Sequence, residues 1–135
     1  MLLNFYNITI KNKMQAIFLK IFGEPASKAN SRRLTTRHGK PMFIKSDKAL
    51  SYATMFKQQC VVSPSQRFID DDVVVTIRIW YASRRPDLDE SLILDLLQDV
   101  AYDNDRQVKE KHIYWMGVDK TNPRCEITVE KIKDS

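Results

Sequence analysis

Two pairs of aspartates carry most of the chemical interest of this sequence, because the members of each pair are two positions apart. Asp87 and Asp89 lie in the stretch RRPDLDES, and Asp103 and Asp105 lie in DNDRQ. In an extended chain, side chains at positions i and i+2 point to the same face, so each pair brings two carboxylates close together. A cation between them offsets the repulsion of like charges. The spacing therefore indicates a cation site.

The first pair also has a purely structural explanation, which the sequence leaves open. Asp89 can cap a helix that begins just after it. Asp87 can form an ion pair with Arg84 or Arg85, which precede it by three and two positions. Under this explanation the acids are only helix caps and surface charges, and the chain is an α/β protein in which these acids bind no cation.

The available ligand types narrow the choice of cation. Only Cys60, Cys125, His38 and His112 offer sulfur or imidazole, and no C-x-x-C pair is present, so we expect free, buried thiols rather than a zinc site. An EF-hand needs Gly at position 6 and Glu at position 12 of its loop, and neither aspartate pair begins this pattern. Carboxylates without His or Cys suit Mg²⁺, with Mn²⁺ as a substitute, and these ions commonly bind phosphate oxygens as well.

The charges of the chain are segregated along the sequence. The formal net charge is +5, yet residues 27–46 carry six basic side chains and no acid, whereas residues 86–105 carry seven acids and no Lys or Arg. A basic segment suits the phosphates of a nucleic acid, and an acidic cluster suits a cation that activates water and stabilises a departing oxygen. Together the two segments indicate phosphodiester hydrolysis.

The periodicity of apolar residues predicts a small α/β or α+β domain. Strands are expected at residues 15–22, 71–82, 108–118 and 124–132, and helices at 46–61 and 91–102. The basic segment from residue 24 to 41 has no usable period and is predicted to be a long loop. We expect the last two strands to pair through a turn at residues 121–123. This order predicts a mixed sheet of about four strands with two main helices.

A single domain is expected, because the length suits one core and the sequence contains no repeat or linker. Residues 14–135 are predicted to form it, with residues 1–13 as a flexible N-terminal extension. No run approaches the ~20 apolar residues that span a bilayer, so no membrane partner is expected.

The helix at 91–102 separates the aspartate pairs by ~16 Å, so they converge only if the following loop folds back or a neighbouring strand begins there.

The stretch RRPDLDESLILDLLQDVAYDNDRQV, with the two strands after it, resembles the RusA-like Holliday junction resolvases of phages and prophages, and the resemblance extends from about Met14 to Lys131. It implies a homodimeric, Mg²⁺-dependent endodeoxyribonuclease that resolves four-way DNA junctions by paired, symmetric cuts in recombination and repair. It also implies action on branched DNA in the cytoplasm of a bacterial host.

By position, the resemblance implies that Asp87, Asp89 and Asp105 are catalytic and bind the metal, with Asp103 as a lesser candidate. A further set of basic residues is expected to bind the DNA backbone. These residues are Lys28, Arg32, Arg33, Arg37, Lys40, Arg84 and Arg85.

Two departures from the family pattern bear on activity. The stretch from Asp89 to Asp105 is about two residues shorter than usual, and it lacks a lysine in the first helical turn, where Glu90-Ser91-Leu92-Ile93 stands. Pro86 occupies a place where an arginine can precede the first aspartate. These departures imply one of three outcomes: an altered metal geometry, a substitute base from Lys45, Lys109 or Lys111, or reduced activity. The alternative is a catalytically silent or weakened protein of the same fold that only binds branched DNA.

Overall fold

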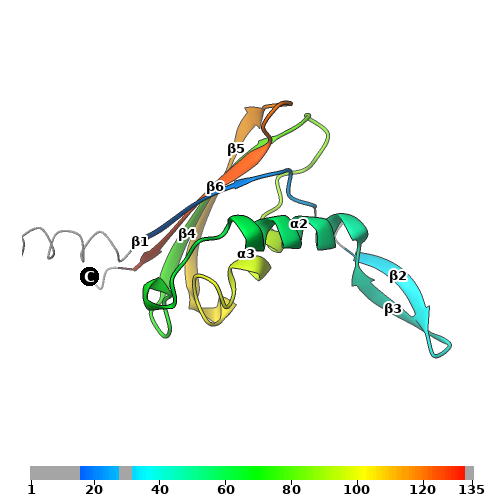
Figure 1. Cartoon of the computed structure of the whole chain (residues 1–135), viewed down its shortest axis with the longest axis horizontal. Coiled ribbons are helices and arrows are strands. Elements are labelled where there is room, and N and C mark those ends of the chain that lie inside the picture. Colours follow the sequence, from blue (N-terminus) through cyan, green and yellow to red (C-terminus); the bar gives the residue numbers. More distant parts are fainter. Residues whose placement is uncertain (1–15, 28–31, 133–135) are drawn as a thin grey trace, which may run out of the picture.

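The computed structural model describes residues 16–27 and 32–132, and for residues 32–37 and 41–45 it describes the backbone alone. These residues form one four-stranded sheet, two helices and a separate hairpin (Figure 1). The strands of the sheet are β1 (Ala16–Phe22), β4 (Val73–Tyr81), β5 (Val108–Val118) and β6 (Arg124–Lys131), and the helices are α2 (Asp47–Gln59) and α3 (Ser91–Leu97). The expected α+β domain with a mixed sheet and two helices is confirmed, and the expected extension at residues 1–13 lies outside the described residues.

The strand order in the sheet is β1-β6-β4-β5, so β4 is hydrogen-bonded on both edges. β5 runs parallel to β4, and β6 runs antiparallel to both β4 and β1. The expected pairing of β5 with β6 is therefore wrong. β4 has the most apolar sequence, VVVTIRIWY, and takes the covered position between them. The connection from β5 to β6 passes the end of β4, where the backbone N–H of Asp119 donates to the carbonyl of Tyr81 (2.8 Å).

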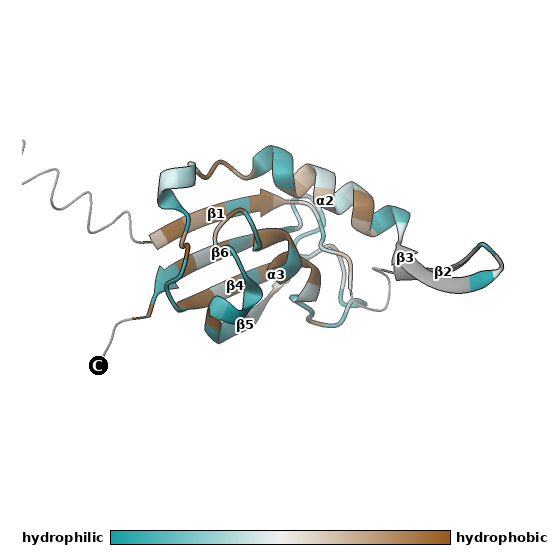
Figure 2. Ribbon diagram, turned by 90° about the horizontal axis from the view of Figure 1, so that it is seen from below, coloured by the Kyte–Doolittle hydropathy of each residue, from teal (hydrophilic) through white to brown (hydrophobic). Residues whose placement is uncertain are grey.

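The core lies between the sheet and the two helices. Alternate residues of β4 from Val73 to Tyr81 are buried and those between them are partly or fully exposed, as in a strand with one covered face. α2 contributes Tyr52 and Phe56 to this core, and α3 contributes Ile93 and Leu97. Figure 2 shows the hydrophobic segments of the strands and of both helices in brown. None of the helices in the described ranges is long and apolar enough to cross a membrane.

Both cysteines are free thiols, as expected. Cys125 is buried on β6, with its sulfur 3.5 Å from the hydroxyl oxygen of Tyr52, and Cys60 is half-buried after the end of α2. Burial raises the pKa of each thiol to about 11. Both therefore stay protonated at neutral pH and lack the thiolate that makes a cysteine reactive.

α2 begins where the sequence predicts. The hydroxyl oxygen of Ser46 accepts a hydrogen bond from the backbone N–H of Ala49 (3.2 Å), and Asp47 lies in the first turn, where the helix dipole favours a carboxylate. The end of the helix is tied to the sheet by Gln59. Its side-chain oxygen accepts from the N–H of Phe22 (2.8 Å), and its side-chain nitrogen donates to the carbonyl of the same residue (2.9 Å).

α3 is shorter than expected, since it ends at Leu97 rather than near residue 102. Asp99 has a positive φ of 69°, and its N–H donates to the carbonyl of Tyr102 (2.6 Å), so the chain reverses just after the helix. The reversal directs Ala101 and Tyr102 into the core, and the hydroxyl of Tyr102 donates to the carbonyl of Leu94 (2.8 Å). The apolar period thus continues beyond the helix because these residues are buried by a turn.

The basic segment is not a loop throughout, because β2 (Arg32–Arg37) and β3 (Lys40–Lys45) form an antiparallel hairpin that projects from the rest of the fold (Figure 1). His38 and Gly39 connect the strands, and both have positive φ (53° and 77°), as a two-residue type I′ turn requires. The loop prediction is wrong because neither strand alternates apolar with polar residues. The His-Gly pair is the local signal that indicates the hairpin.

We predict that Gly39→Val opens the hairpin and leaves the rest of the fold intact. A β-branched residue at positive φ costs roughly 1–2 kcal/mol, and an isolated two-stranded hairpin is only marginally stable. Amide hydrogen exchange should become faster at residues 32–45 and stay unchanged in β4. Gly39→Asn is the matched control, because Asn tolerates this backbone region. Equal exchange rates in the two variants would contradict the turn assignment.

Candidate active site

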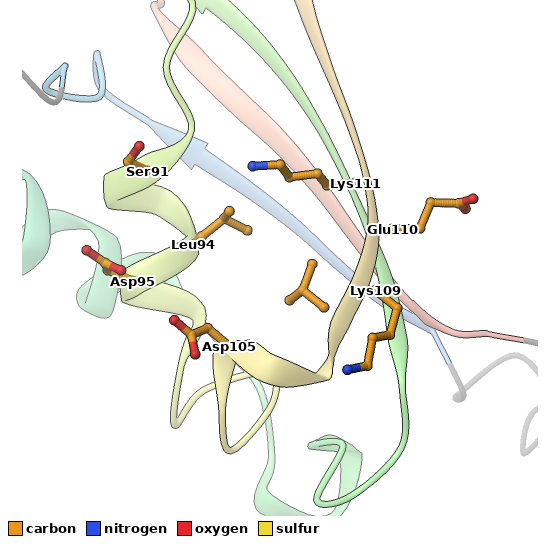
Figure 3. Close-up of a pocket in the computed structure, with 8 residues that line it drawn as sticks. Ser91, Leu94, Asp95, Asp105, Lys109, Glu110 and Lys111 are labelled. Atoms are coloured by element: carbon orange, nitrogen blue, oxygen red, sulfur yellow. The ribbon is translucent and has the colours of Figure 1, made fainter.

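A cleft of about 400 Å³ lies between α3 and the first residues of β5 (Figure 3). Two acids, Asp95 and Asp105, lie on the side of the helix, and two bases, Lys109 and Lys111, lie on the side of the strand. The other lining residues are Ser91, Leu94, Val108 and Glu110. A cleft with both charge signs offers oxygen ligands for a cation next to ammonium groups for a phosphate.

Asp105 reaches the cleft from a short turn, η3 (Asp105–Gln107). The side-chain oxygen of Asn104 caps this turn by accepting a hydrogen bond from the backbone N–H of Arg106 (2.9 Å). Asp105 is exposed, so its carboxylate is open to a ligand from solvent. The structure therefore brings one of the three proposed metal ligands into the cleft.

The buried side chain of Gln107 fixes the backbone around this turn. Its Oε1 accepts from the N–H groups of Asp103 and Asn104 (2.9 Å each), and its Nε2 donates to the carbonyls of Phe68 (3.1 Å) and Asp71 (3.0 Å). The amide uses both its donors and two acceptor positions, so it holds one arrangement of the loop. Gln107 belongs to the family motif in the sequence, but no local pattern indicates this role.

Asp87 and Asp89 lie in the loop between β4 and α3, where Tyr81 holds the backbone. Tyr81 is the last residue of β4, and its hydroxyl donates to the carbonyl of Asp87 (3.1 Å) and accepts from the N–H of Asp89 (3.2 Å). Burial raises the pKa of the Tyr81 phenol above its ordinary value, so the hydroxyl keeps the proton that it donates. Tyr81 is therefore a positioning residue, although its sequence pattern indicates only a strand residue.

Asp89 makes a local contact at the start of α3. Its Oδ1 accepts a hydrogen bond from the N–H of Ser91 (2.9 Å), although the N-cap position itself belongs to Glu90. Asp87 is exposed, and within the described part of the chain it forms no ion pair with an arginine of the preceding stretch. The local contact of Asp89 at the start of α3 therefore accounts for part of its role. An ion pair with Arg84 or Arg85 does not account for Asp87.

The two aspartate segments lie at opposite ends of α3. Asp89 contacts Ser91 at the first turn, and Asp105 lies beside the far end of the helix (Figure 3). Among residues 16–27 and 32–132, no group of three or more His, Cys, Asp or Glu side chains is close enough together to hold a metal. Asp95 lies between the two ends on the polar face of α3 and lines the cleft, a place that its sequence pattern does not indicate.

Asp103 points to Arg67 and does not line the cleft. Its Oδ1 lies 2.9 Å from the Nε of Arg67. The same guanidinium donates from Nη1 to the carbonyl of Asp99 (3.1 Å). These contacts tie the turn after α3 to the segment before β4, so Asp103 has a structural role in the free protein.

Residues 23–130 match the model of the family described as Endodeoxyribonuclease RusA. The chain belongs to the RusA endodeoxyribonuclease family. The matched range includes the hairpin, both helices and both aspartate pairs. The chain is therefore an enzyme of the endodeoxyribonuclease class, in a family that acts on Holliday junctions. No curated protein matches its sequence.

The basic residues expected to bind DNA in this RusA-family chain lie in two places. Arg32, Arg33 and Arg37 belong to β2, the exposed Lys40 begins β3, and Lys28 lies outside the described residues. The other two, Arg84 and Arg85, are exposed in the loop between β4 and α3. The guanidinium carbon of Arg84 lies 5.8 Å from the ring centroid of Trp115 on β5, a distance at which a cation–π contact forms.

Two of the lysines considered as substitutes for the missing helix lysine of the RusA pattern lie in the cleft. Lys109 and Lys111 come from β5 rather than from α3. The ammonium nitrogen of Lys111 lies 2.8 Å from Oε1 of Glu90, just before α3. This ion pair spans the cleft at the end where the first aspartate segment lies. The structure describes only the backbone of Lys45, the third lysine considered.

We predict that Tyr81→Phe lowers the rate of DNA cleavage much more than it lowers stability. The substitution removes both hydrogen bonds to the loop of Asp87 and Asp89 and keeps the buried ring, so the net loss of folding free energy is about 1 kcal/mol. A displaced loop should reduce the rate roughly 10- to 100-fold. Tyr52→Phe is the control, because its hydroxyl contacts Cys125 and not this loop. Equal rate losses in the two variants would refute the positioning role.

Proposed function

We propose that this RusA-family endodeoxyribonuclease is a Mg²⁺-dependent homodimer that resolves four-way DNA junctions by paired, symmetric phosphodiester cleavage. The family match over residues 23–130 carries the proposal. The cleft supports it, because carboxylates and lysines face each other across α3 and β5. The proposed setting is recombination and repair in the cytoplasm of a bacterial host, with a phage or prophage as the source of the chain.

The proposed metal ligands are Asp87, Asp89 and Asp105. Their carboxylate oxygens are of the type that Mg²⁺ prefers, with Mn²⁺ as a substitute. Mg²⁺ usually keeps several waters and binds one or two protein carboxylates together with phosphate oxygens of the substrate. The free chain therefore does not need three carboxylates in contact, and the exposed Asp105 suits a first ligand. When bound, the ion supplies a Lewis acid that stabilises charge on the departing oxygen.

The lysines of the cleft are proposed to bind the phosphate beside the carboxylates. Lys111 is the proposed substitute for the missing helix lysine. Its ion pair with Glu90 places the ammonium group beside the start of α3, and the half-exposed ammonium has further N–H donors for a phosphate oxygen. Lys109 adds a second positive charge on the same strand. The lysines on the wall formed by β5 attract a phosphate, so it can approach the acids on the wall formed by α3, which would otherwise repel it.

The hairpin β2–β3 is proposed to bind the backbone of a junction arm. Its strands project from the sheet, so its basic residues can reach phosphates outside the cleft (Figure 1). Contacts between arginines and phosphates position a protein on DNA without reading its sequence. This suits an enzyme that recognises the shape of a junction.

The homodimer is proposed from the symmetry of the substrate. A four-way junction is approximately two-fold symmetric, and its resolution needs two symmetric cuts. One copy of the chain carries one cleft with this set of residues in its described part. A C₂ dimer is the simplest closed assembly that supplies the second.

We predict that Asp87→Asn, Asp89→Asn and Asp105→Asn each reduce cleavage of a labelled four-way junction by more than about 100-fold, because each removes a charge that the metal requires. Junction binding should stay equal or become tighter, since one negative charge no longer repels phosphate. Asp70→Asn, at an exposed loop position, is the matched control and should cleave at the wild-type rate.

The same assay tests the function of the wild-type chain when junction and linear duplex are compared with and without Mg²⁺. Cleavage of the junction that depends on Mg²⁺ is the expected result. A protein that binds the junction and never cuts it would be the catalytically silent binder instead. Wild-type activity in one of the three variants would remove that residue from the site.

We predict that replacing Lys28, Arg32, Arg33 and Arg37 with Ala weakens junction binding and flattens its salt dependence. Each lost phosphate contact should reduce the slope of log affinity against log salt concentration by roughly one unit. Lys57→Ala, at an exposed position on α2, is the control for loss of positive charge. An unchanged slope in the fourfold variant would show that these residues do not contact phosphates.

A further inference from the structure

An exposed tryptophan, Trp115, lies on the face of the sheet that also forms the cleft. Trp115 on β5 is in register with Ile79 of β4, whose side chain is buried in the core between sheet and helices. Lys111, which lines the cleft, is in register with the buried Val75 in the same way. Side chains alternate between the two faces of a sheet, so Trp115 and Lys111 share one face and lie roughly 13 Å apart along the strand.

α3 leaves this end of β5 uncovered. The helix begins beside Lys111, whose ammonium group contacts Glu90 just before the first turn (2.8 Å), and β5 continues past this point to Val118 (Figure 3). Trp115 is therefore 43% exposed, and Val118 is 40% exposed. A tryptophan carries the largest aromatic surface of any side chain and is usually well buried. Its exposure beside the cleft leaves a flat apolar ring open to a ligand.

Arg84 connects this ring to the loop of the first aspartate pair. Its guanidinium carbon lies 5.8 Å from the ring centroid of Trp115, and it precedes Asp87 by three positions. The hydroxyl of Tyr81 holds the backbone at Asp87 and Asp89, so the course of this loop is fixed. Trp115 therefore lies beside the segment that carries two of the proposed metal ligands.

Exposed cations lie on the two connections at this end of the sheet. The N–H of Asp119 donates to the carbonyl of Tyr81 (2.8 Å), so the turn after β5 lies beside the loop after β4 (Figure 1). These connections carry the exposed side chains of Arg84, Arg85 and Lys120. None of the three forms an ion pair with a carboxylate in the ranges 16–27 and 32–132. They are therefore available to phosphates on either side of a ligand that contacts the ring.

An unpaired nucleobase is the ligand that fits an aromatic ring next to arginines. Such a base stacks on the ring through its own π-face, while the phosphates of the same strand bind the cations. A base inside a duplex is already stacked on its neighbours, and its release costs free energy. A branch point interrupts the continuous stack of a duplex, so the bases beside it are released most easily.

We propose that Trp115 is a stacking site for an unpaired base at the branch point of the DNA, with Arg84 bound to a phosphate beside that base. The inference rests on the branched DNA of the proposed function and adds a contact to its bases. The stacked base holds its strand next to Asp87 and Asp89. It also favours branched over linear DNA, because a linear duplex offers no unpaired base.

Tryptophan fluorescence tests the stacking site, because Trp80 and Trp115 are the two tryptophans of the chain. Trp80→Phe leaves Trp115 as the only reporter, and Trp115→Phe leaves Trp80, which points to the opposite face of the sheet. A four-way junction is added in EDTA, so that no metal-dependent cleavage occurs. It should quench the fluorescence of Trp80→Phe by about half or more, whereas a linear duplex should have little effect. The fluorescence of Trp115→Phe should respond to neither DNA.

Junction affinity separates stacking from a structural role of the same side chain. Trp115→Leu keeps an apolar side chain without a π-face and should weaken junction binding roughly 10-fold, the loss expected for one base–aromatic stack. Trp115→Phe is the matched control, because it keeps a ring and should retain most of the affinity. Both variants should bind linear duplex as the wild type does, and circular dichroism confirms that each is folded.

The outcomes separate the stacking site from the proposed function. Equal quenching of Trp115 by junction and duplex would overturn the stacking site, and so would equal junction affinities of the Leu and Phe variants. The cleavage assay reports separately. Quenching by a junction that the chain never cuts leaves the stacking site standing and sinks the nuclease proposal. Junction cleavage by a chain whose Trp115 is not quenched does the reverse.

Discussion

The parallel pairing of β4 with β5 determines where the carboxylates can lie. β5 begins beside Val73, the first residue of β4, so the chain that leaves β4 at Tyr81 must return along the sheet before β5 starts. α3 makes this return. Asp87 and Asp89 lie where the crossover begins, and Asp105 lies where it ends. The cleft is the space between the returning helix and the new strand, and the distance between the aspartate segments follows from the length of the strands.

Two buried polar side chains hold the ends of this crossover. The hydroxyl of Tyr81 bridges the backbone of the first aspartate segment, and the amide of Gln107 bridges the second to the segment before β4. A buried polar group that loses its hydrogen-bond partner costs more free energy than a paired group contributes to stability. The hydroxyl of Tyr81 and the amide of Gln107 therefore each favour a single loop arrangement. Lys111 differs, because its ion pair with Glu90 is exposed on the lysine side and weak in water. The backbone around the acids is thus fixed by hydrogen bonds, while the base beside them remains free to adjust to a ligand.

The described surface divides into regions of different charge. The cleft carries acids and bases on opposite walls, the hairpin is basic in sequence, and the sheet face opposite α2 and α3 exposes the aromatic side chains of Phe18, Phe22 and Tyr114. The net charge of +5 is the sum over the whole chain and describes none of these regions. The first two regions suit different partners: the cleft suits a cation with a phosphate, and the hairpin suits a DNA backbone.

The sequence by itself determined the four strands of the sheet, the start of α2 at Ser46 and the membership of the family, because these depend on local periodicity, capping and a contiguous motif. It gave the wrong end for α3, since Ala101 and Tyr102 continue the apolar period through a turn, and it missed a hairpin that lacks alternation. Only the tertiary structure decided the strand order, the place of Asp95 in the cleft and the role of Gln107. These depend on contacts between distant segments, such as Gln107 with Phe68 across 39 positions, and no local pattern of residues encodes such a contact.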